Sequence, residues 1–179
     1  MTRVARFDAV LFDWMLTLAH YPSPHQHVQT AMAALGRTAV TGDVDRIVES
    51  MDRARQLPDV QAAEAVEDTS AAAHHHSEHL LYRSAGIDAD LADEMYRLLG
   101  TPSFHLPYPD ALPALRQLSE SGLRIGVVSD IHVDLRVHAE QFGFGQHIDA
   151  WALSYELGVQ KPEPSWRRSS SWVPGRSER

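Results

Sequence analysis

Asp13 is the first residue in this chain whose type and position favour chemistry. It closes residues 9–13, in which four apolar residues predict a short buried strand. A carboxylate at the end of a buried strand is costly to hide without a partner, and ligands of open α/β sheets bind beyond the carboxyl ends of the strands. Asp13 is therefore placed to act as a nucleophile or a metal ligand. The alternative is an aspartate that caps the next turn.

Lys161 is the second such residue, because it is the only lysine among the 16 lysines and arginines of the chain. An ammonium is a compact point charge with rotatable donors, whereas a guanidinium is a planar fork. A site that must contact a single phosphoryl or carboxylate oxygen can require the ammonium. A surface lysine without a role is the alternative.

Two further apolar segments resemble the first one. Residues 123–128 predict a strand that ends in Ser129 and Asp130, and residues 150–153 predict another, followed by 154–164. Short helical patterns alternate with these strands, and this alternation indicates a parallel sheet. Asp130 either supplies an acid near the site or lies in a turn.

Together, these segments resemble the haloacid dehalogenase-like (HAD) hydrolase superfamily. Asp13 and Thr17 match its first motif, Ser129 its second, and Lys161 with Pro162 its third. The resemblance implies an α/β fold, with a Rossmann-like parallel sheet core, incomplete here, and an inserted all-helical cap. It also implies a hydrolase in which Asp13 attacks a small phosphorylated or halogenated metabolite and forms a covalent intermediate.

The resemblance assigns roles to the motif residues. Thr17 and Ser129 would donate hydrogen bonds to the substrate's oxygens, and Lys161 would supply positive charge. Mg²⁺ would be held by the Asp13 carboxylate, the backbone carbonyl of Met15 and acids of a fourth motif.

Two positions depart from the family pattern. Met15 stands where family phosphatases have an acid–base aspartate, and a thioether cannot transfer a proton at neutral pH. The dehalogenase branch also lacks that aspartate, so carbon–halogen chemistry stays open. Leu16 stands where glycine is usual, and it restricts the backbone. The alternative function is a non-catalytic remnant, or a module that binds a small molecule or an anion.

The chain divides by composition into several segments. Residues 1–21 and 107–164 are expected to form the core, and residues 22–106, which show only helical spacing, the cap. Helices are expected over 25–35, 43–57, 60–84, 88–99, 110–121 and 133–142. The arginine- and serine-rich tail 165–179 fits neither unit, and no fourth motif is recognisable. We interpret this end as a truncation or a shifted reading frame, or alternatively as a disordered tail.

Composition narrows the classes of partner. A net charge of −8 argues against a nucleic-acid surface, the chain has no cysteine, and no apolar run reaches the roughly 18 residues that cross a bilayer. We therefore expect a cytoplasmic protein with a small-molecule substrate and neither nucleic acid nor membrane as a partner. The oligomeric state stays open.

Several histidines are secondary candidates. His75 and His79 lie one helical turn apart in a cluster at 74–79 and could share a metal, although a solvated helix face is the favoured interpretation. His132 could flank the active site. Pro22 and Pro24 prevent a continuous helix after the first strand and predict a hinge out of the core. Three histidines lie near this hinge, where a substrate could enter: His20, His25 and His27.

Overall fold

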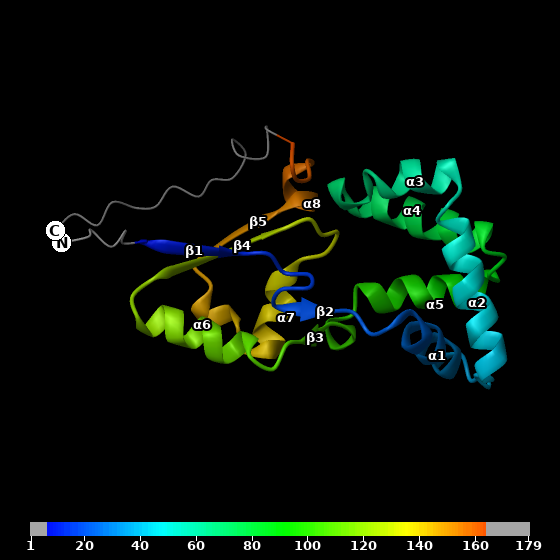
Figure 1. Ribbon diagram of the computed structural model, residues 1–179, viewed down its shortest axis with the longest axis horizontal. Helices are drawn as coiled ribbons and strands as arrows, with labels where there is room; N and C mark the ends of the chain where they lie inside the picture. Colours follow the sequence, from blue (N-terminus) through cyan, green and yellow to red (C-terminus); the bar gives the residue numbers. More distant parts are fainter. Residues whose placement is uncertain (1–6, 164–179) are drawn as a thin grey trace.

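The computed structural model describes residues 7–163, which form a small parallel sheet and a group of helices (Figure 1). The sheet has the strand order β1–β4–β5, and both strand pairs are parallel. Its strands are β1 (Ala9–Phe12), β4 (Arg124–Ser129) and β5 (Ala150–Leu153). The mixed α/β fold with a parallel sheet confirms the predicted fold class.

The register of the sheet brings the motif residues to one edge. Phe12 pairs with Val127, and Ser129 pairs with Leu153. The residues that follow β1 and β4, including Asp13 and Asp130, therefore leave the sheet at its carboxyl end. Strand β4 begins and ends one residue later than the strand expected over 123–128 from its apolar run.

One hydrophobic cluster lies beside the sheet. Helices α6 (Ala111–Glu120) and α7 (Leu135–Phe142) lie along the same side of the strands (Figure 1). Trp14, Leu115 and Ile125 are fully buried in this cluster. Leu112, Leu115 and Leu118 repeat at helical spacing, which explains why α6 forms and packs here.

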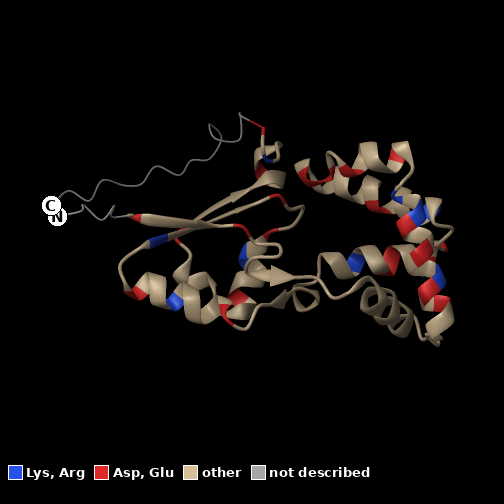
Figure 2. Cartoon of the chain, viewed as in Figure 1, with Lys and Arg blue, Asp and Glu red and all other residues tan. Residues whose placement is uncertain are grey.

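The helices between the first two strands of the sheet form a separate hydrophobic cluster, built on residues 28–104. We call this part the helical unit. It contains α1 (Pro24–Ala34), α2 (Thr41–Ala54), α3 (Pro58–Glu64), α4 (Ala71–Ser84) and α5 (Ala89–Leu99). Basic and acidic residues are interspersed along these helices (Figure 2), and ion pairs join Arg53 with Glu49 in α2 and Arg97 with Glu94 in α5. The assignment of the unit as a cap stays a prediction.

Two antiparallel segments connect the helical unit to the sheet. They are β2 (Ala19–His20) and β3 (Leu106–Pro107), in which Ala19 pairs with Pro107. Ser23 then caps α1 in a capping box with Gln26, and Pro24 occupies the first turn. The chain therefore enters the helical unit at the prolines predicted to form a hinge.

The expectation of a single helix over 60–84 is wrong. Pro58 starts α3 earlier, α3 ends at Glu64, and a short 3₁₀ turn η1 (Glu67–Thr69) precedes α4. The Ser70 hydroxyl accepts a hydrogen bond from the Ala73 N–H and so starts a new helix. Alanine-rich composition outweighed this local capping signal in the sequence interpretation.

The remaining short elements complete the description. They are η2 (Pro102–Phe104), η3 (Gly145–His147) and α8 (Ser154–Leu157). Within residues 7–163, no helix combines the length and apolar character needed to cross a membrane. The arginine- and serine-rich tail 165–179 lies outside the described residues.

Candidate active site

Asp13 lies where the chain leaves β1. Its carboxylate is 47% exposed, and Oδ1 accepts a hydrogen bond from the Trp14 N–H at 2.7 Å. Trp14 itself is completely buried and packs its ring against Phe142, Phe144 and Trp151. The buried indole therefore anchors the backbone next to Asp13, while the carboxylate stays accessible.

Lys161 contacts both strand ends. Its Nζ lies 2.9 Å from Oδ2 of Asp13 and 3.4 Å from the carbonyl oxygen of Val128. Its backbone N–H donates to Oδ1 of Asp130 at 3.0 Å. Lys161 thus joins the ends of β1 and β4, although its own segment follows α8.

Ser129 and Thr17 are less directly engaged. Ser129 is fully buried, and its hydroxyl donates to the backbone carbonyl of Asp130 at 3.3 Å. Thr17 is exposed in the turn after Asp13, where its N–H donates to the Trp14 carbonyl. Asp13 and Lys161 are therefore the two predicted catalytic residues whose side chains are in direct contact, whereas the hydrogen bonds described for Ser129 and Thr17 go to backbone carbonyls.

The two departures from the motif have different structural consequences. Met15 is half-buried and lines a cavity, so the cavity wall has a thioether where family phosphatases have a carboxylate. Leu16 has a φ of 59° and a side chain that is 77% exposed. That left-handed conformation is costly for leucine, which explains why glycine suits the position better.

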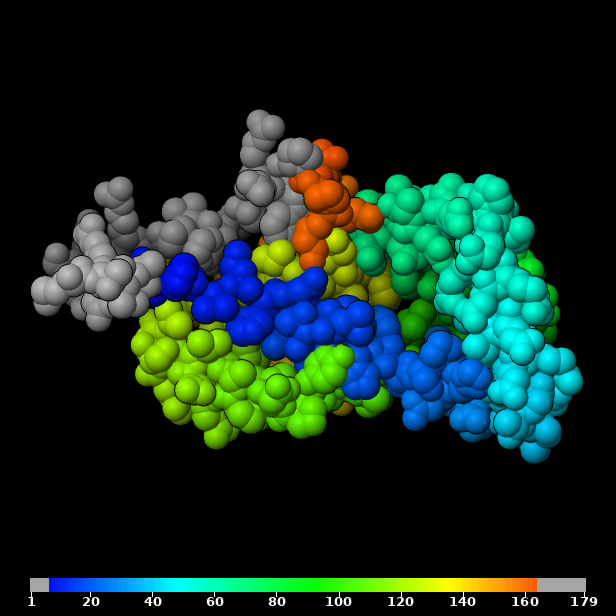
Figure 3. Space-filling model, in the orientation of Figure 1, coloured from blue at the N-terminus to red at the C-terminus, as the bar shows by residue number. Residues whose placement is uncertain are grey.

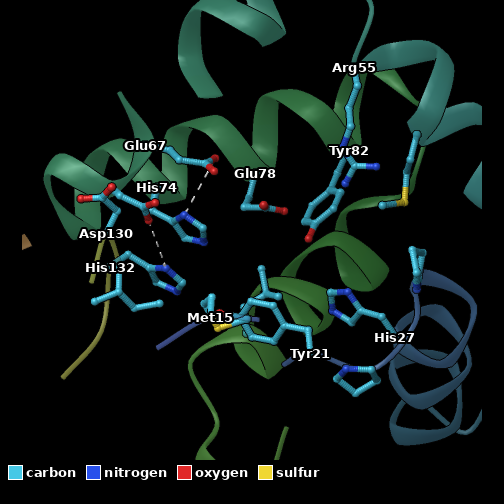
Figure 4. Close-up of a pocket in the computed structure, with 16 residues that line it drawn as sticks. Met15, Tyr21, His27, Arg55, Glu67, His74, Glu78, Tyr82, Asp130 and His132 are labelled. Carbon is cyan, nitrogen blue, oxygen red and sulfur yellow. Dashed lines mark ion pairs between the residues drawn. The ribbon is translucent and has the colours of Figure 1, made fainter. Parts of the chain in front are cut away.

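A cavity of about 260 Å³ lies between the carboxyl end of the sheet and the helical unit (Figure 4). On the face seen in Figure 3, the surface is hollowed between the two units. Met15 and Asp130 contribute to the cavity from the motif segments, and Tyr21, Tyr82 and Arg55 contribute from the connection and the helical unit. Lys161 instead lines a more open hollow beside residues 65–69.

Carboxylic acids gather along the cavity. Burial raises the pKa of Glu67 to about 7 and that of Asp68 to about 6, and it also raises the pKa of Glu78. Neighbouring carboxylates add to these shifts. Arg55 is the arginine among the described residues that line the cavity. Because the cavity wall has several carboxylic acids beside this arginine, it favours protonated acids or a bound cation.

Two histidines lie beside these acids. His74 comes from α4, and His132 comes from the loop after β4; burial lowers the pKa of His74 to about 4 and that of His132 to about 2. The two rings stack, with centroids 3.3 Å apart and planes 6° apart. His132, which the sequence suggested could flank the active site, lines this cavity; its role stays a prediction.

The burial of His74 was not predicted from the sequence. The sequence interpretation singled out His75 and His79, whose rings lie 4.2 Å apart, but His75 is exposed, whereas His74 is buried. Three adjacent histidines on a helix point about 100° apart. Only the packing of α4 against its neighbours selects which of them faces inward.

The hinge histidines differ in their surroundings. His27 lines the cavity, and its Nε2 lies 2.9 Å from the carbonyl oxygen of Met95. Nε2 of His25 lies 3.3 Å from Oδ1 of Asp45, and Nδ1 of His20 lies 2.8 Å from the carbonyl oxygen of Tyr21. Among these three, His27 is therefore the one that reaches the cavity wall.

A comparison with known protein families shows which family the chain belongs to. The model of the haloacid dehalogenase-like hydrolases matches residues 7–165. The chain belongs to this family. The haloacid dehalogenase-like chain is also 29% identical over 163 residues to glyceraldehyde 3-phosphate phosphatase from Methanopyrus kandleri. That match covers 87% of the chain and 65% of the phosphatase, so the chain matches less than two thirds of this relative.

Solved structures share the fold. A dehalogenase matches 92% of the chain with a TM-score of 0.62 and 17% identity, over 70% of its own length. L-2-haloacid dehalogenase from Xanthobacter autotrophicus, with chloropropionic acid covalently bound, matches 91% with a TM-score of 0.57 and 19% identity, over 63% of its length. At these identities, the likeness supports the haloacid dehalogenase-like fold.

Proposed function

We propose that this chain is a hydrolase that uses Asp13 as its nucleophile on a small phosphorylated or halogenated metabolite. The observation that carries the proposal is the contact between Asp13 and Lys161 at the carboxyl end of the sheet. An accessible carboxylate beside the chain's only lysine combines a nucleophile with a charge that can neutralise an anionic substrate.

The proposed reaction has two steps. An oxygen of Asp13 attacks the phosphorus or carbon atom, and the bond to the leaving group breaks with its electron pair on that group. Water then hydrolyses the covalent intermediate, and the Asp13 carboxylate is regenerated. Lys161 neutralises charge on the substrate. Ser129 would have to turn its hydroxyl from the Asp130 carbonyl to donate to a substrate oxygen.

Mg²⁺ belongs to this proposal as a cofactor for phosphoryl transfer. The Asp13 side chain is about half exposed and contacts the Lys161 ammonium, while the Asp130 carboxylate contacts the Lys161 backbone N–H, so two hard oxygen donors lie near Lys161. Mg²⁺ commonly uses one or two carboxylates and retains several waters, which suits this set together with the Met15 carbonyl. When bound, the ion would supply additional positive charge to the transferring group.

Met15 favours a second candidate reaction. Without an aspartate at this position, a phosphatase loses a positioned proton donor, a loss that typically costs about 10²–10⁴-fold in rate. Halide is a weak base that leaves without protonation, so dehalogenation tolerates Met15. The Methanopyrus kandleri relative is named a phosphatase, and the Xanthobacter structure is named a dehalogenase. Both reaction types therefore belong in the test.

The helical unit would act as the cap in this proposal. It contributes Arg55 and Tyr82 to the wall of the cavity, and the connection contributes Tyr21, beside Met15 (Figure 4). A substrate that extends from Asp13 into this cavity would contact both units. Side chains of the helical unit would then shape the choice of substrate.

A substrate panel tests the proposal. The purified full chain is incubated with small phosphomonoesters in Mg²⁺ and with 2-haloacids, and released phosphate and halide are measured separately. Intact mass after a rapid quench then reports a covalent adduct, mapped by digestion to the peptide with Asp13. An adduct on that peptide supports the nucleophile. Absence of turnover and adduct across both panels favours the non-catalytic alternative, a module that binds a small molecule or an anion.

A further inference from the structure

His74 is buried, and among the described residues no hydrogen bond reaches its ring. Its side chain is on the inner surface of α4, 5% of the residue is exposed, and within residues 7–163 neither Nδ1 nor Nε2 has a hydrogen-bond partner. A buried polar group without a partner loses its hydration without a compensating hydrogen bond, which is unfavourable. A ligand that accepts a hydrogen bond from the ring, or a metal ion that a ring nitrogen coordinates, would remove that cost.

His132 has the same deficit on the opposite side. It is 7% exposed, and its Nε2 lacks a hydrogen-bond partner among the described residues. Its Nδ1 lies 4.0 Å from Oδ1 of Asp68, too far for a hydrogen bond. Because its ring stacks on that of His74, the two imidazoles do not satisfy each other.

Asp68 completes the group with a carboxylate oxygen. One ligand atom from each of Asp68, His74 and His132 lies within 4.8 Å of the others, and all three residues line the cavity. Figure 4 shows His74 and His132 beside each other. Ser154 fixes the position of this segment, because its hydroxyl donates to the Asp68 carbonyl at 2.6 Å and accepts from the Ile131 N–H at 2.8 Å.

We propose that Asp68, His74 and His132 bind a divalent first-row transition metal ion of the Zn²⁺ class. Two imidazoles and one carboxylate are typical ligands of such ions, whereas Mg²⁺ prefers oxygen ligands alone. Binding requires the stacked rings to turn so that one nitrogen of each faces the ion. The remaining coordination position opens into the cavity.

The ion would connect the two units of the chain. Asp68 and His74 belong to the helical unit, and His132 belongs to the loop after β4. A shared metal therefore stabilises the arrangement in which the helical unit lies over the end of the sheet. This site is separate from the proposed Asp13 chemistry and does not rest on it.

A competing set of ligands shares His74. Glu67, His74 and Glu78 also bring ligand atoms within 4.8 Å of one another, and all three belong to the helical unit. We favour the set with His132 because it adds a second buried imidazole on the cavity wall whose Nε2 has no hydrogen-bond partner among the described residues. The two sets make opposite predictions for substitutions of His132 and Glu78.

Equilibrium dialysis with Zn²⁺ tests the site on the full chain after treatment with a chelator. One ion per chain is expected in the parent and in Asp13→Asn, which removes the carboxylate proposed for Mg²⁺. His74→Gln and His132→Gln are expected to weaken binding at least tenfold. His75→Gln, an exposed neighbour on the same helix, serves as the matched control and should bind like the parent.

Several outcomes would overturn the proposal. Unchanged binding in both His74→Gln and His132→Gln would place the ion elsewhere, and lost binding in His75→Gln would assign it to the exposed histidines. Lost binding in Glu78→Gln with retained binding in His132→Gln would assign it to the helical unit alone. X-ray absorption of the Zn²⁺-loaded parent needs no variant; two imidazole ligands are expected, and none would contradict the site.

Discussion

The ammonium nitrogen of Lys161 lies 2.9 Å from a carboxylate oxygen of Asp13, although the two residues are 148 positions apart in sequence. The contact forms because β1 and β4 are parallel neighbours and because Lys161 also contacts the Val128 carbonyl and the Asp130 carboxylate. One lysine therefore links the ends of two strands in a position to neutralise charge beside the proposed nucleophile.

Substitution of Lys161 should mainly affect turnover. Lys161→Met removes the positive charge beside Asp13 and is expected to lower kcat/KM by about 10²–10³-fold, as removal of a positioned transition-state donor does. Lys161→Arg should not restore the rate, because a planar guanidinium does not reproduce the compact ammonium. Steady-state kinetics on the best substrate of the panel measure both. Exposed Arg116→Met is the control; equal losses in both Met variants would contradict a specific role.

Leu16→Gly should stabilise the fold. Leu16 holds a φ of 59° and leaves its side chain 77% exposed, so glycine relieves backbone strain and removes little packing. We expect the free energy of unfolding to rise by about 1 kcal/mol in urea denaturation. Val137→Gly, at an exposed apolar position inside α7, should instead destabilise by a similar amount. The same sign for both variants would refute the strain at Leu16.

Ser154→Ala should destabilise the contact between the two units. The Ser154 hydroxyl bonds to the Asp68 carbonyl and to the backbone of Ile131, and the residue is fully buried. Loss of the hydroxyl leaves a buried N–H without its acceptor, which costs about 1–3 kcal/mol. Thermal unfolding should show a lower Tm than exposed Ser103→Ala. Identical Tm values would show that these hydrogen bonds contribute little.

The stability of the chain should depend on the protonation of Glu67. Burial raises its pKa from 4.5 to about 7, so the folded state binds more protons than the unfolded state between these values. The stabilisation is complete below about pH 4.5 and is lost as the pH rises through about 7. Glu67→Gln keeps a neutral side chain and should exceed the parent's stability at pH 8 by on the order of 1 kcal/mol.

The Glu67→Gln difference should shrink towards zero at pH 5. Urea denaturation at both pH values, in the presence of a chelator, measures it. Exposed Glu120→Gln is the control and should not change with pH in this way. A Glu67→Gln effect of the same size at pH 5 and pH 8 would mean that proton binding by Glu67 is not responsible.

The sheet was predictable because its apolar runs are short and end in polar residues. The first and third strands, expected over 9–12 and 150–153, have those bounds in the structure, and the middle strand differs by one residue. The expectation that the first strand is buried is wrong: β1 lies at one edge of the described sheet, and its Leu11 is 56% exposed. The break before α4 was not predicted, because alanine content favours a helix throughout 60–84 while a single serine decides where α4 begins.

The candidate site was only partly predictable. The motif resemblance assigned Asp13 and Lys161 to the same site, and the structure places them in contact. The inward direction of His74 depends on how α4 packs against α3 and α5, and its pairing with His132 depends on how the helical unit meets the sheet. Neither relationship leaves a signal in local spacing, so three adjacent histidines alone could not identify the buried one.

The most direct measurement is the turnover of Asp13→Asn on the best substrate from the phosphoester and haloacid panel. A nucleophilic Asp13 predicts that phosphate or halide release falls to the background rate, while Asp110→Asn, at an exposed position, keeps the parent's rate. Circular dichroism of both variants verifies that they fold. Release by Asp13→Asn at the parent's rate would contradict Asp13 as the nucleophile.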